Sequence, residues 1–338
     1  MKKLSFLLFG LLLLLAACGS GGSNGSTNEP TDNSNGSNTG ETTEETKTYK
    51  IGTTQIVEHP SLDAATQGFK DAITDSGLKV EFVDNNAQND QSMNVTIAQD
   101  LVSQNVDLIF ANSTPSAQAA KNATADIPIV FTSVTDPVIA ELVSSMEAPG
   151  GNVTGTVDLH PETIAKTVDF IVNELGIKKV GTVYNTGEQN SVVQVEQVKA
   201  LLEEQGGQLV EAAVTTSAEV KQATESLLGQ VDAFYIITDN TVVSALASVV
   251  DVANSNKLPL IVGELDSVAG GGLAAFGFSY YDIGYEAGEM AVKILKGEAK
   301  PSEIPAAYPG NLKLVVNKST ADTIGVEIKD SWNAELVE

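Results

Sequence analysis

The chain has 338 residues, of which 19 are lysine and 44 are acidic, and its formal net charge is −25. Such an acidic chain is a poor partner for nucleic acid or anionic lipid, because both attract basic surfaces. It contains no arginine, so the usual bidentate clamp for a carboxylate or phosphate is missing. Any anionic group of a ligand must instead be held by hydroxyls, backbone N–H groups, a helix N-terminus or lysine.

The N-terminus has the pattern of an export signal. Lys2 and Lys3 precede an apolar run from Leu4 to Leu15, which is too short to span a bilayer but suits a secretory signal. The run ends in Leu15-Ala16-Ala17-Cys18, which resembles a bacterial lipobox. Cys18 is the only cysteine, so no intrachain disulfide can form, and lipidation would give this residue a role. We predict a signal peptide over residues 1–17 and a lipid (palmitate) anchor on Cys18; a plain signal peptide is the alternative.

A polar tether is predicted to follow the anchor, so that residues 18–48 comprise the lipidated cysteine and a linker. Residues 19–48 are almost entirely Gly, Ser, Asn, Thr and Glu, which offer no apolar surface to offset chain entropy. A disordered linker of that length spans on the order of 30 Å. The chain is therefore expected at the extracytoplasmic face of the cell membrane, held through its lipid alone, with a mature charge of −27 once Lys2 and Lys3 are removed.

From Tyr49 onward, apolar strands alternate with amphipathic helices, which is typical of parallel βαβ units. About 290 residues remain here, which suits two lobes better than one core. Helical spacing of apolar residues predicts the first helix, and Gly77 ends it. In chain order, the first half is predicted to contain the strand Tyr49–Gln55, a helix over 61–75, the strand Lys79–Val83, a helix over 92–104, the strand Val106–Ala111, a helix over 115–124 and the strand Ile127–Phe131.

The second half of the chain repeats the first. Residues 49–77 align with 178–206, residues 106–120 with 231–247, and residues 127–137 with 258–268, and a polar turn recurs at the same place each time. We predict an α/β fold of two similar, doubly wound parallel-sheet lobes. Ligands of such sheets bind outside the carboxyl ends of the strands, so the polar turns of both lobes should surround one cleft that closes by a hinge motion.

The candidate ligand-binding residues are therefore the polar side chains in these turns. Core packing is favoured for Phe131, Phe276 and Phe278, although they could form an apolar wall. The candidates are Gln55, Glu58, Thr114, Ser116, Thr135, Asp136, Tyr184, Asn185, Asn190, Ser191, Asp239, Asn240, Thr241, Glu264 and Asp266.

Two of these turns open helices, and each has a structural and a functional interpretation. Thr114 suits the N-cap and Pro115 the first turn of one helix, whose free N–H groups could hold a carboxylate. Asp239 in the second lobe could cap the helix predicted over 242–254, or it could pair with a ligand ammonium. The sequence leaves both pairs of alternatives open.

Catalysis finds little support in the sequence. There is no Walker loop and no nucleophile elbow, and His59 and His160 show no metal-ligand spacing. We therefore expect neither enzyme activity, nor a cofactor, nor a metal. A transcription regulator of similar fold would need a DNA-binding segment and a basic face, neither of which this acidic chain offers.

At these turns the sequence resembles the ABC-transporter substrate-binding lipoproteins that include tryptophan- and tyrosine-binding members. The family often has Asp where Glu264 stands, and an acidic residue where Ser279 stands. The resemblance covers residues 49–324 and rests on VEHPSLDAATQGF, STPSAQAAKNATADIPIVFTSVTDPV, PGGNVTG, YNTGEQNSVVQVE, TDNTVVSAL and YYDIGYEAGEMAVKILKGEAKPSEIP.

This resemblance implies a type I periplasmic-binding fold with three chain crossings between the lobes, near 155–159, 264–272 and 308–314. Lobe one would hold residues 49–157 and 267–307, and lobe two residues 158–266 and 308–338. The implied ligand is a small neutral amino acid, with aromatic ones favoured, and the implied partners are ABC permease subunits. A sugar or nucleoside ligand is the alternative, and a monomer is expected.

Overall fold

The structure is a computed structural model that describes residues 47–338, which belong to one compact unit. The predicted signal peptide, Cys18 and nearly all of the predicted linker lie outside the described residues. No helix between residues 47 and 338 is long and apolar enough to cross a membrane.

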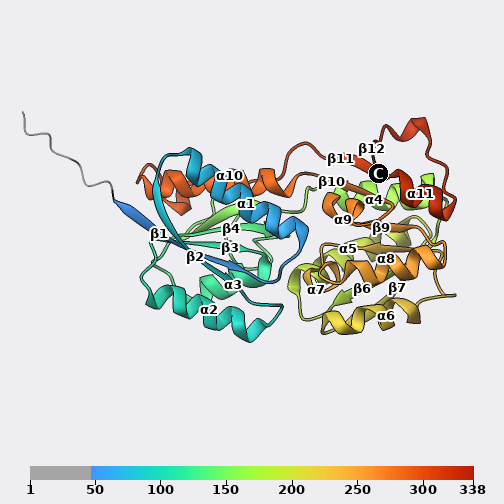
Figure 1. The fold of residues 1–338 in the computed structure, drawn as a ribbon, viewed down its shortest axis with the longest axis horizontal. Helices are drawn as coiled ribbons and strands as arrows, with labels where there is room; N and C mark the ends of the chain where they lie inside the picture. Colours follow the sequence, from blue (N-terminus) through green and yellow to red (C-terminus); the bar gives the residue numbers. More distant parts are fainter. Residues whose placement is uncertain (1–46) are drawn as a thin grey trace, which may run out of the picture. The chain divides into compact units, whose positions relative to one another are not determined.

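The first sheet has five parallel strands in the order β2-β1-β3-β4-β5 (Figure 1). Helices α1 and α10 pack on one face of the sheet, and α2 and α3 on the other. The bounds are β1 Thr48–Gln55, α1 Pro60–Asp75, β2 Lys79–Asn86, α2 Gln91–Ser103, β3 Leu108–Asn112, α3 Thr114–Ala123, β4 Ile129–Val134, β5 Val153–Val157 and α10 Tyr280–Leu295.

The second sheet has seven strands in the order β12-β11-β10-β9-β8-β6-β7, and only the β10–β11 pair is antiparallel. Its strands are β6 Lys179–Asn185, β7 Gln208–Val214, β8 Ala233–Ile236, β9 Leu260–Val262, β10 Ala274–Gly277, β11 Lys313–Asn317 and β12 Glu335–Val337. Its helices are α4 Thr163–Asp169 with a π-helical turn over Phe170–Glu174, α5 Gln189–Glu204, α6 Val220–Ser226, α7 Asn240–Val243, α8 Leu246–Ser255, α9 Leu265–Ala269 and α11 Lys318–Ile324, and short 3₁₀ segments lie at 217–219, 301–303 and 330–332.

The predicted repeat is confirmed by the order of the strands. The run β7-β6-β8-β9-β10 in the second sheet reproduces the run β2-β1-β3-β4-β5 in the first. The two predicted doubly wound lobes are therefore present, and the second carries β11 and β12 as an extension.

One predicted lobe boundary differs from the structure. Residues 267–307 were expected in lobe one, but α9 and β10 (265–277) belong to the second sheet, where β10 pairs with β9 and β11. The physical reason is the repeat itself, because β10 is the counterpart of β5 and completes its own sheet. The chain crosses back only at 278–279. Lobe one therefore consists of residues 48–157 and 280–307, and lobe two of residues 158–279 and 308–338.

Helix α10 returns to lobe one and packs tightly along α1. Small residues allow this approach, since a Cβ added at Gly284 would lie 1.9 Å from the carbonyl oxygen of Ala65. The contact joins distant parts of the chain, because the Tyr281 hydroxyl donates to Asp71 over a separation of 210 residues.

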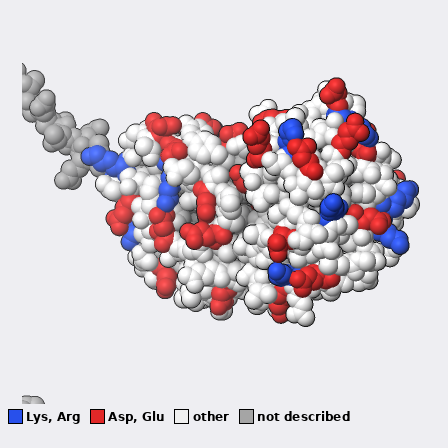
Figure 2. All heavy atoms as spheres, turned by 45° about the vertical axis from the view of Figure 1, so that its right-hand side comes forward, with Lys and Arg blue, Asp and Glu red and all other residues white. Residues whose placement is uncertain are grey.

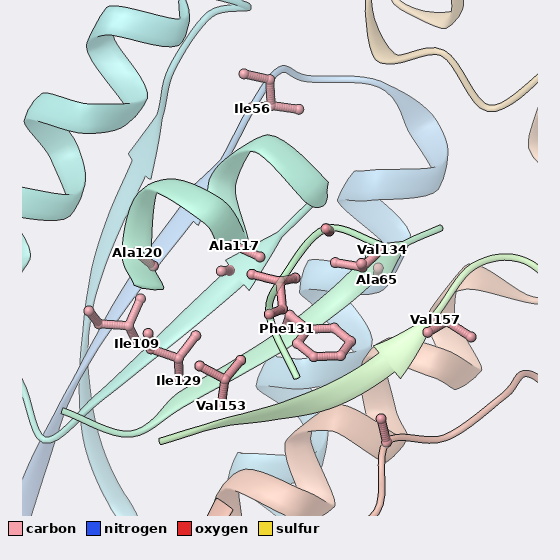
Figure 3. Packing of buried hydrophobic residues seen from close by; sticks show 14 of the residues in the cluster. Ile56, Ala65, Ile109, Ala117, Ala120, Ile129, Phe131, Val134, Val153 and Val157 are labelled. Carbon is pink, nitrogen blue, oxygen red and sulfur yellow. The ribbon is translucent and has the colours of Figure 1, made fainter. Parts of the chain in front are cut away.

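The core of lobe one is a dense cluster of aliphatic side chains on the strands and on α1 and α3. Figure 3 shows Phe131 within it, close to Val134, Ala65 and Val157. Phe131 is fully buried in this cluster, so it packs in the core, which is the role predicted from the sequence.

Candidate functional site

The polar turns of the two lobes meet, and side-chain hydrogen bonds join them. Gln194 in α5 donates to Thr135 Oγ1 at 3.1 Å, and Asn89 donates to Thr241 Oγ1 at 2.9 Å. The Ser61 hydroxyl at the start of α1 donates to Asp266 Oδ2 at 3.0 Å. The strand ends of both sheets therefore meet at the interface between the lobes, and we call this interface the interlobe cleft.

A cluster of three carboxylates lies in this cleft, from Asp158, Glu264 and Asp266. Asp158 follows β5, where the chain crosses into lobe two, and it is 7% exposed; Glu264 and Asp266 stand at the start of α9, and Glu264 is 2% exposed. The Tyr280 hydroxyl at the start of α10 donates to Asp158 Oδ2 at 2.9 Å. We call Asp158, Glu264, Asp266 and Tyr280 the acid cluster.

The carboxylates of the acid cluster face each other without a counter-charge. Burial raises the pKa of Glu264 to about 7, and nearby Asp266 adds to the effect while the hydrogen bond from the Ser267 hydroxyl opposes it. Burial also raises the pKa of Asp158 to about 6, against the hydrogen bond from Tyr280. In the described part of the chain, no lysine forms an ion pair with any of the three. Because a buried anion needs a cation, the cluster is suited to an ammonium group.

Two further buried acids, Glu188 and Asp239, bond to the start of α7. Asp239 Oδ1 accepts from the backbone N–H of Val242, and its Oδ2 accepts from the N–H of Asn185 and the hydroxyl of Ser191, both at 2.7 Å. Glu188 accepts from the backbone N–H and side chains of Asn240 and Thr241. The backbone N–H groups at the start of α7 are therefore already paired with carboxylates of the chain itself.

The equivalent turn of lobe one, at the start of α3, carries no carboxylate. Ser113, not the predicted Thr114, is the N-cap, because its hydroxyl accepts from the N–H of Ser116. Thr114 Oγ1 accepts from the N–H of Thr135 at 3.4 Å, and the Ser116 hydroxyl donates to Asn94 Oδ1 at 3.1 Å. The Asn94 amide nitrogen is buried and without a partner.

Comparison with known proteins identifies the family of this chain. A model of the ABC transporter substrate binding proteins matches residues 50–336. The chain belongs to this family. It is therefore a substrate-binding protein rather than an enzyme, as predicted, and solved periplasmic binding proteins with low sequence identity share its two-lobed fold.

Three relatives of this substrate-binding protein are informative. A tyrosine-binding protein of Clostridioides difficile is 43% identical over 298 residues, which cover 86% of this chain and 85% of the relative. A Streptococcus pneumoniae domain solved in complex with L-Trp has a TM-score of 0.80 at 34% identity, covering 86% of this chain and 100% of that one. A substrate-binding protein from Clostridium difficile, solved ligand-free and open, has a TM-score of 0.64 at 43% identity, covering 86% of this chain and 99% of that one.

Four predicted site residues of the substrate-binding protein bond within their own lobes or face solvent. Gln55 bonds to Val57, Asp63, Thr66 and Asn112 within lobe one. Glu58 is exposed, Asp136 caps its own turn through the N–H groups of Val138 and Ile139, and Tyr184 donates to Glu211 in β7. The remaining candidates lie at the interlobe turns described above or beside them. Asn185, Asn190 and Ser191 bond to the turn that starts α7.

Several cleft residues were not among the predicted site residues, namely Asp158, Tyr280, His59, Asn94 and Gln194. His59 is 7% exposed and its Nδ1 has no partner, while burial lowers its pKa to about 4. The VEHPSLD and YYDIGYEAGE stretches marked His59 and Tyr280 as part of the resemblance, whereas Asn94 lies inside a helix and gave no turn signal. Within the described residues, no group of three or more His, Cys, Asp or Glu side chains is arranged to hold a metal ion.

The contacts of Asp239 favour the capping interpretation, and a substitution tests it. Asp239→Ala leaves the buried N–H groups of Asn185 and Val242 without an acceptor, and each such loss destabilises by about 1–3 kcal/mol. We expect a clear drop in the melting temperature of the ligand-free protein. Asp136→Ala removes a more exposed cap of similar geometry and should have a smaller effect. Equal melting temperatures for the two variants would argue against this role.

Proposed function

We propose that this substrate-binding protein binds an aromatic L-amino acid, tyrosine or tryptophan, in the interlobe cleft. The observation that carries the proposal is the acid cluster, where buried Asp158 and Glu264 have no cationic partner in the described chain. The tyrosine-binding relative and the L-Trp complex support the ligand class.

The ammonium group of the ligand is placed at Glu264, between Asp158 and Asp266. Among the buried acids, Glu264 accepts one hydrogen bond from Ser267 at 2.8 Å, which leaves its other oxygen for the ligand, whereas each oxygen of Asp239 already accepts from the chain. Pairing with a cation would relieve the repulsion among these carboxylates and lower their pKa values.

The carboxylate of the ligand is placed at the start of α3. In the absence of arginine, the Asn94 amide and the Thr114 hydroxyl are neutral donors that suit an anion beside a helix N-terminus. The Asn94 amide nitrogen is buried and has no hydrogen-bond partner, which favours a ligand carboxylate at this position.

An aromatic wall for the ligand side chain adjoins the acid cluster. The rings of Phe278 and Tyr280 stack with centroids 5.7 Å apart, and both side chains belong to the buried core of lobe one, whose edge would form this wall. Phe278 lies in the second crossing and Tyr280 directly follows it, so the proposed wall, ammonium site and hinge are contiguous. The TM-scores support a closed lobe arrangement, because the L-Trp complex matches this chain better than the open relative despite its lower sequence identity.

Calorimetry with matched ligands tests the proposal. L-tyrosine and L-tryptophan should bind, and tyramine and 3-(4-hydroxyphenyl)propionate, which each lack one charge of tyrosine, should bind much more weakly. Glucose and adenosine stand for the sugar and nucleoside alternative. Heat on binding either of these, with none for the aromatic amino acids, would refute the proposal.

The lipid anchor and the ABC permease complete the proposed role of an importer receptor. The anchor rests on Leu15–Cys18, which lie outside the described residues. Cys18→Ala is expected to abolish lipid labelling and to release the protein from the membrane fraction. Cys18→Ala protein that still incorporates labelled palmitate would contradict the anchor.

A further inference from the structure

The loop between β2 and α2 has an unusual backbone that holds Asn89 against the other lobe. Gln88 and Asn89 both have left-handed backbones, with φ of 52° and 63°. For residues other than glycine this conformation is unfavourable, although asparagine tolerates it best. The loop is tied to the end of β1, since Ala87 N–H donates to the Gln55 carbonyl at 2.9 Å and Asn89 N–H to the Ile56 carbonyl at 2.7 Å.

The side chain of Asn89 completes the hydrogen bonds of a buried hydroxyl in the other lobe. Thr241 Oγ1 donates its one hydrogen to Glu188 at 2.7 Å and accepts from Asn185 at 2.9 Å. A hydroxyl has two acceptor positions, and the amide of Asn89 fills the second at 2.9 Å. Because Thr241 is fully buried, this acceptor position has no evident alternative partner.

We propose that Asn89 is a closure latch, a positioning residue that slows ligand release without touching the ligand. It bonds from lobe one to Thr241 at the start of α7, and this bond must break when the lobes separate. None of its hydrogen bonds reaches the acid cluster. The inference rests on the proposed function in one respect, that the ligand leaves by separation of the lobes.

Three variants isolate the latch. Asn89→Gly keeps the left-handed backbone and removes the amide. Asn89→Asp turns the donor into an acceptor against the Thr241 hydroxyl and adds a negative charge near buried Glu188. Gln88→Gly is the matched control, because it relaxes the same loop at an exposed residue that has no part in the contact.

Stopped-flow measurement with L-tyrosine should show faster dissociation, by about 5- to 10-fold for Asn89→Gly, since one hydrogen bond contributes about 1 kcal/mol. Asn89→Asp should have a larger effect. Association rates and the ligand-free melting temperature should stay near those of the wild type, which a merely structural role would not allow. Unchanged dissociation in both Asn89 variants, or the same acceleration in Gln88→Gly, would overturn the latch.

A second measurement does not depend on the identity of the ligand. Spin labels on Asp126→Cys in lobe one and Ser226→Cys in lobe two, in a Cys18→Ser background, report the distance between the lobes of the ligand-free protein. Asn89→Asp should shift the distribution to open conformers, and Gln88→Gly should not. If no aromatic amino acid binds the wild type, the proposed function fails, but this shift still supports the latch. Where the ligand-free wild type includes closed conformers, a wild-type distribution in Asn89→Asp refutes the latch even where tyrosine binds; where it is already open, the dissociation rates decide.

Discussion

Replacing Glu264 by glutamine is expected to weaken binding of L-tyrosine or L-tryptophan by roughly 30-fold to several thousandfold. The reason is that the ligand ammonium, once desolvated in the cleft, would lose its charged partner, and such a loss costs about 2–5 kcal/mol. Glutamine keeps the size of the side chain and an oxygen that can accept from Ser267. Calorimetry on the purified variant measures the effect.

The stability of the ligand-free Glu264→Gln protein should move in the opposite direction. Burial raises the pKa of Glu264 to about 7, above its unfolded value, so the stability that this group contributes is lost as the pH rises through about 7. Removing the charge should therefore leave the melting temperature at pH 7.5 unchanged or higher. Asp136→Asn, which alters an acid of a local turn, is the control and should bind as the wild type does. A Glu264→Gln protein with wild-type affinity would remove Glu264 from the ammonium site.

The affinity for the same ligands is expected to fall as the pH is lowered from 7.5 to 5.5. The pKa values of Glu264 and Asp158 are raised to about 7 and about 6, so both carboxyl groups take up protons in this interval. A ligand cation requires their ionised forms, and each pH unit below a pKa lowers the ionised fraction about tenfold. Together the two groups predict a loss of roughly 30- to 100-fold, measurable by calorimetry across the interval.

The Glu264→Gln variant also separates the sources of this pH dependence. Its loss of affinity between pH 7.5 and 5.5 should be shallower, since within the acid cluster only Asp158, beside Tyr280, then keeps a pKa raised into this interval. Asp239, whose pKa is raised to about 7 by burial and by Glu188, titrates equally in both proteins. The pKa of His59 is lowered to about 4 by burial, so this residue stays neutral over the interval. Affinity that is flat, or that rises toward pH 5.5, would contradict the ammonium assignment.

Most of the fold could be predicted because the chain carries its topology twice. The alternation of strand and helix, and the alignment of residues 49–77 with 178–206, predicted both lobes, and the strand orders agree. The boundary error at β10 arose because this strand has only four residues and follows three consecutive glycines, Gly270 to Gly272. Pairing with β9 and β11 decides its place, and pairing is not a local property of the sequence.

The site was harder to predict, because a turn in the sequence identifies candidate residues but not the groups that each side chain contacts. Asp239 could cap or bind, and only the donors from Asn185, Ser191 and Val242 distinguish the two. Asp158 and Tyr280 are 122 residues apart and meet because two crossings of the chain lie side by side. Distances of that kind come from tertiary packing. The acidic surface, which Figure 2 shows as carboxylates spread over both lobes, gave no signal for the buried cluster.

The return of α10 to lobe one has a consequence for the order in which the protein folds. As the chain emerges from its N-terminus, β1 to β5 and their helices come first, but the face of the sheet that α1 shares with α10 stays partly uncovered until residues 280–295 follow. By then all five strands of the repeated half of lobe two, through β10, are already present. Contacts across so many residues form late, because the chain between them must be ordered first. Lobe two is therefore expected to fold before lobe one is complete. A chain that ends before Tyr280 would expose Phe69 and Ile73, and exposed apolar residues of this kind lead partly folded chains to aggregate.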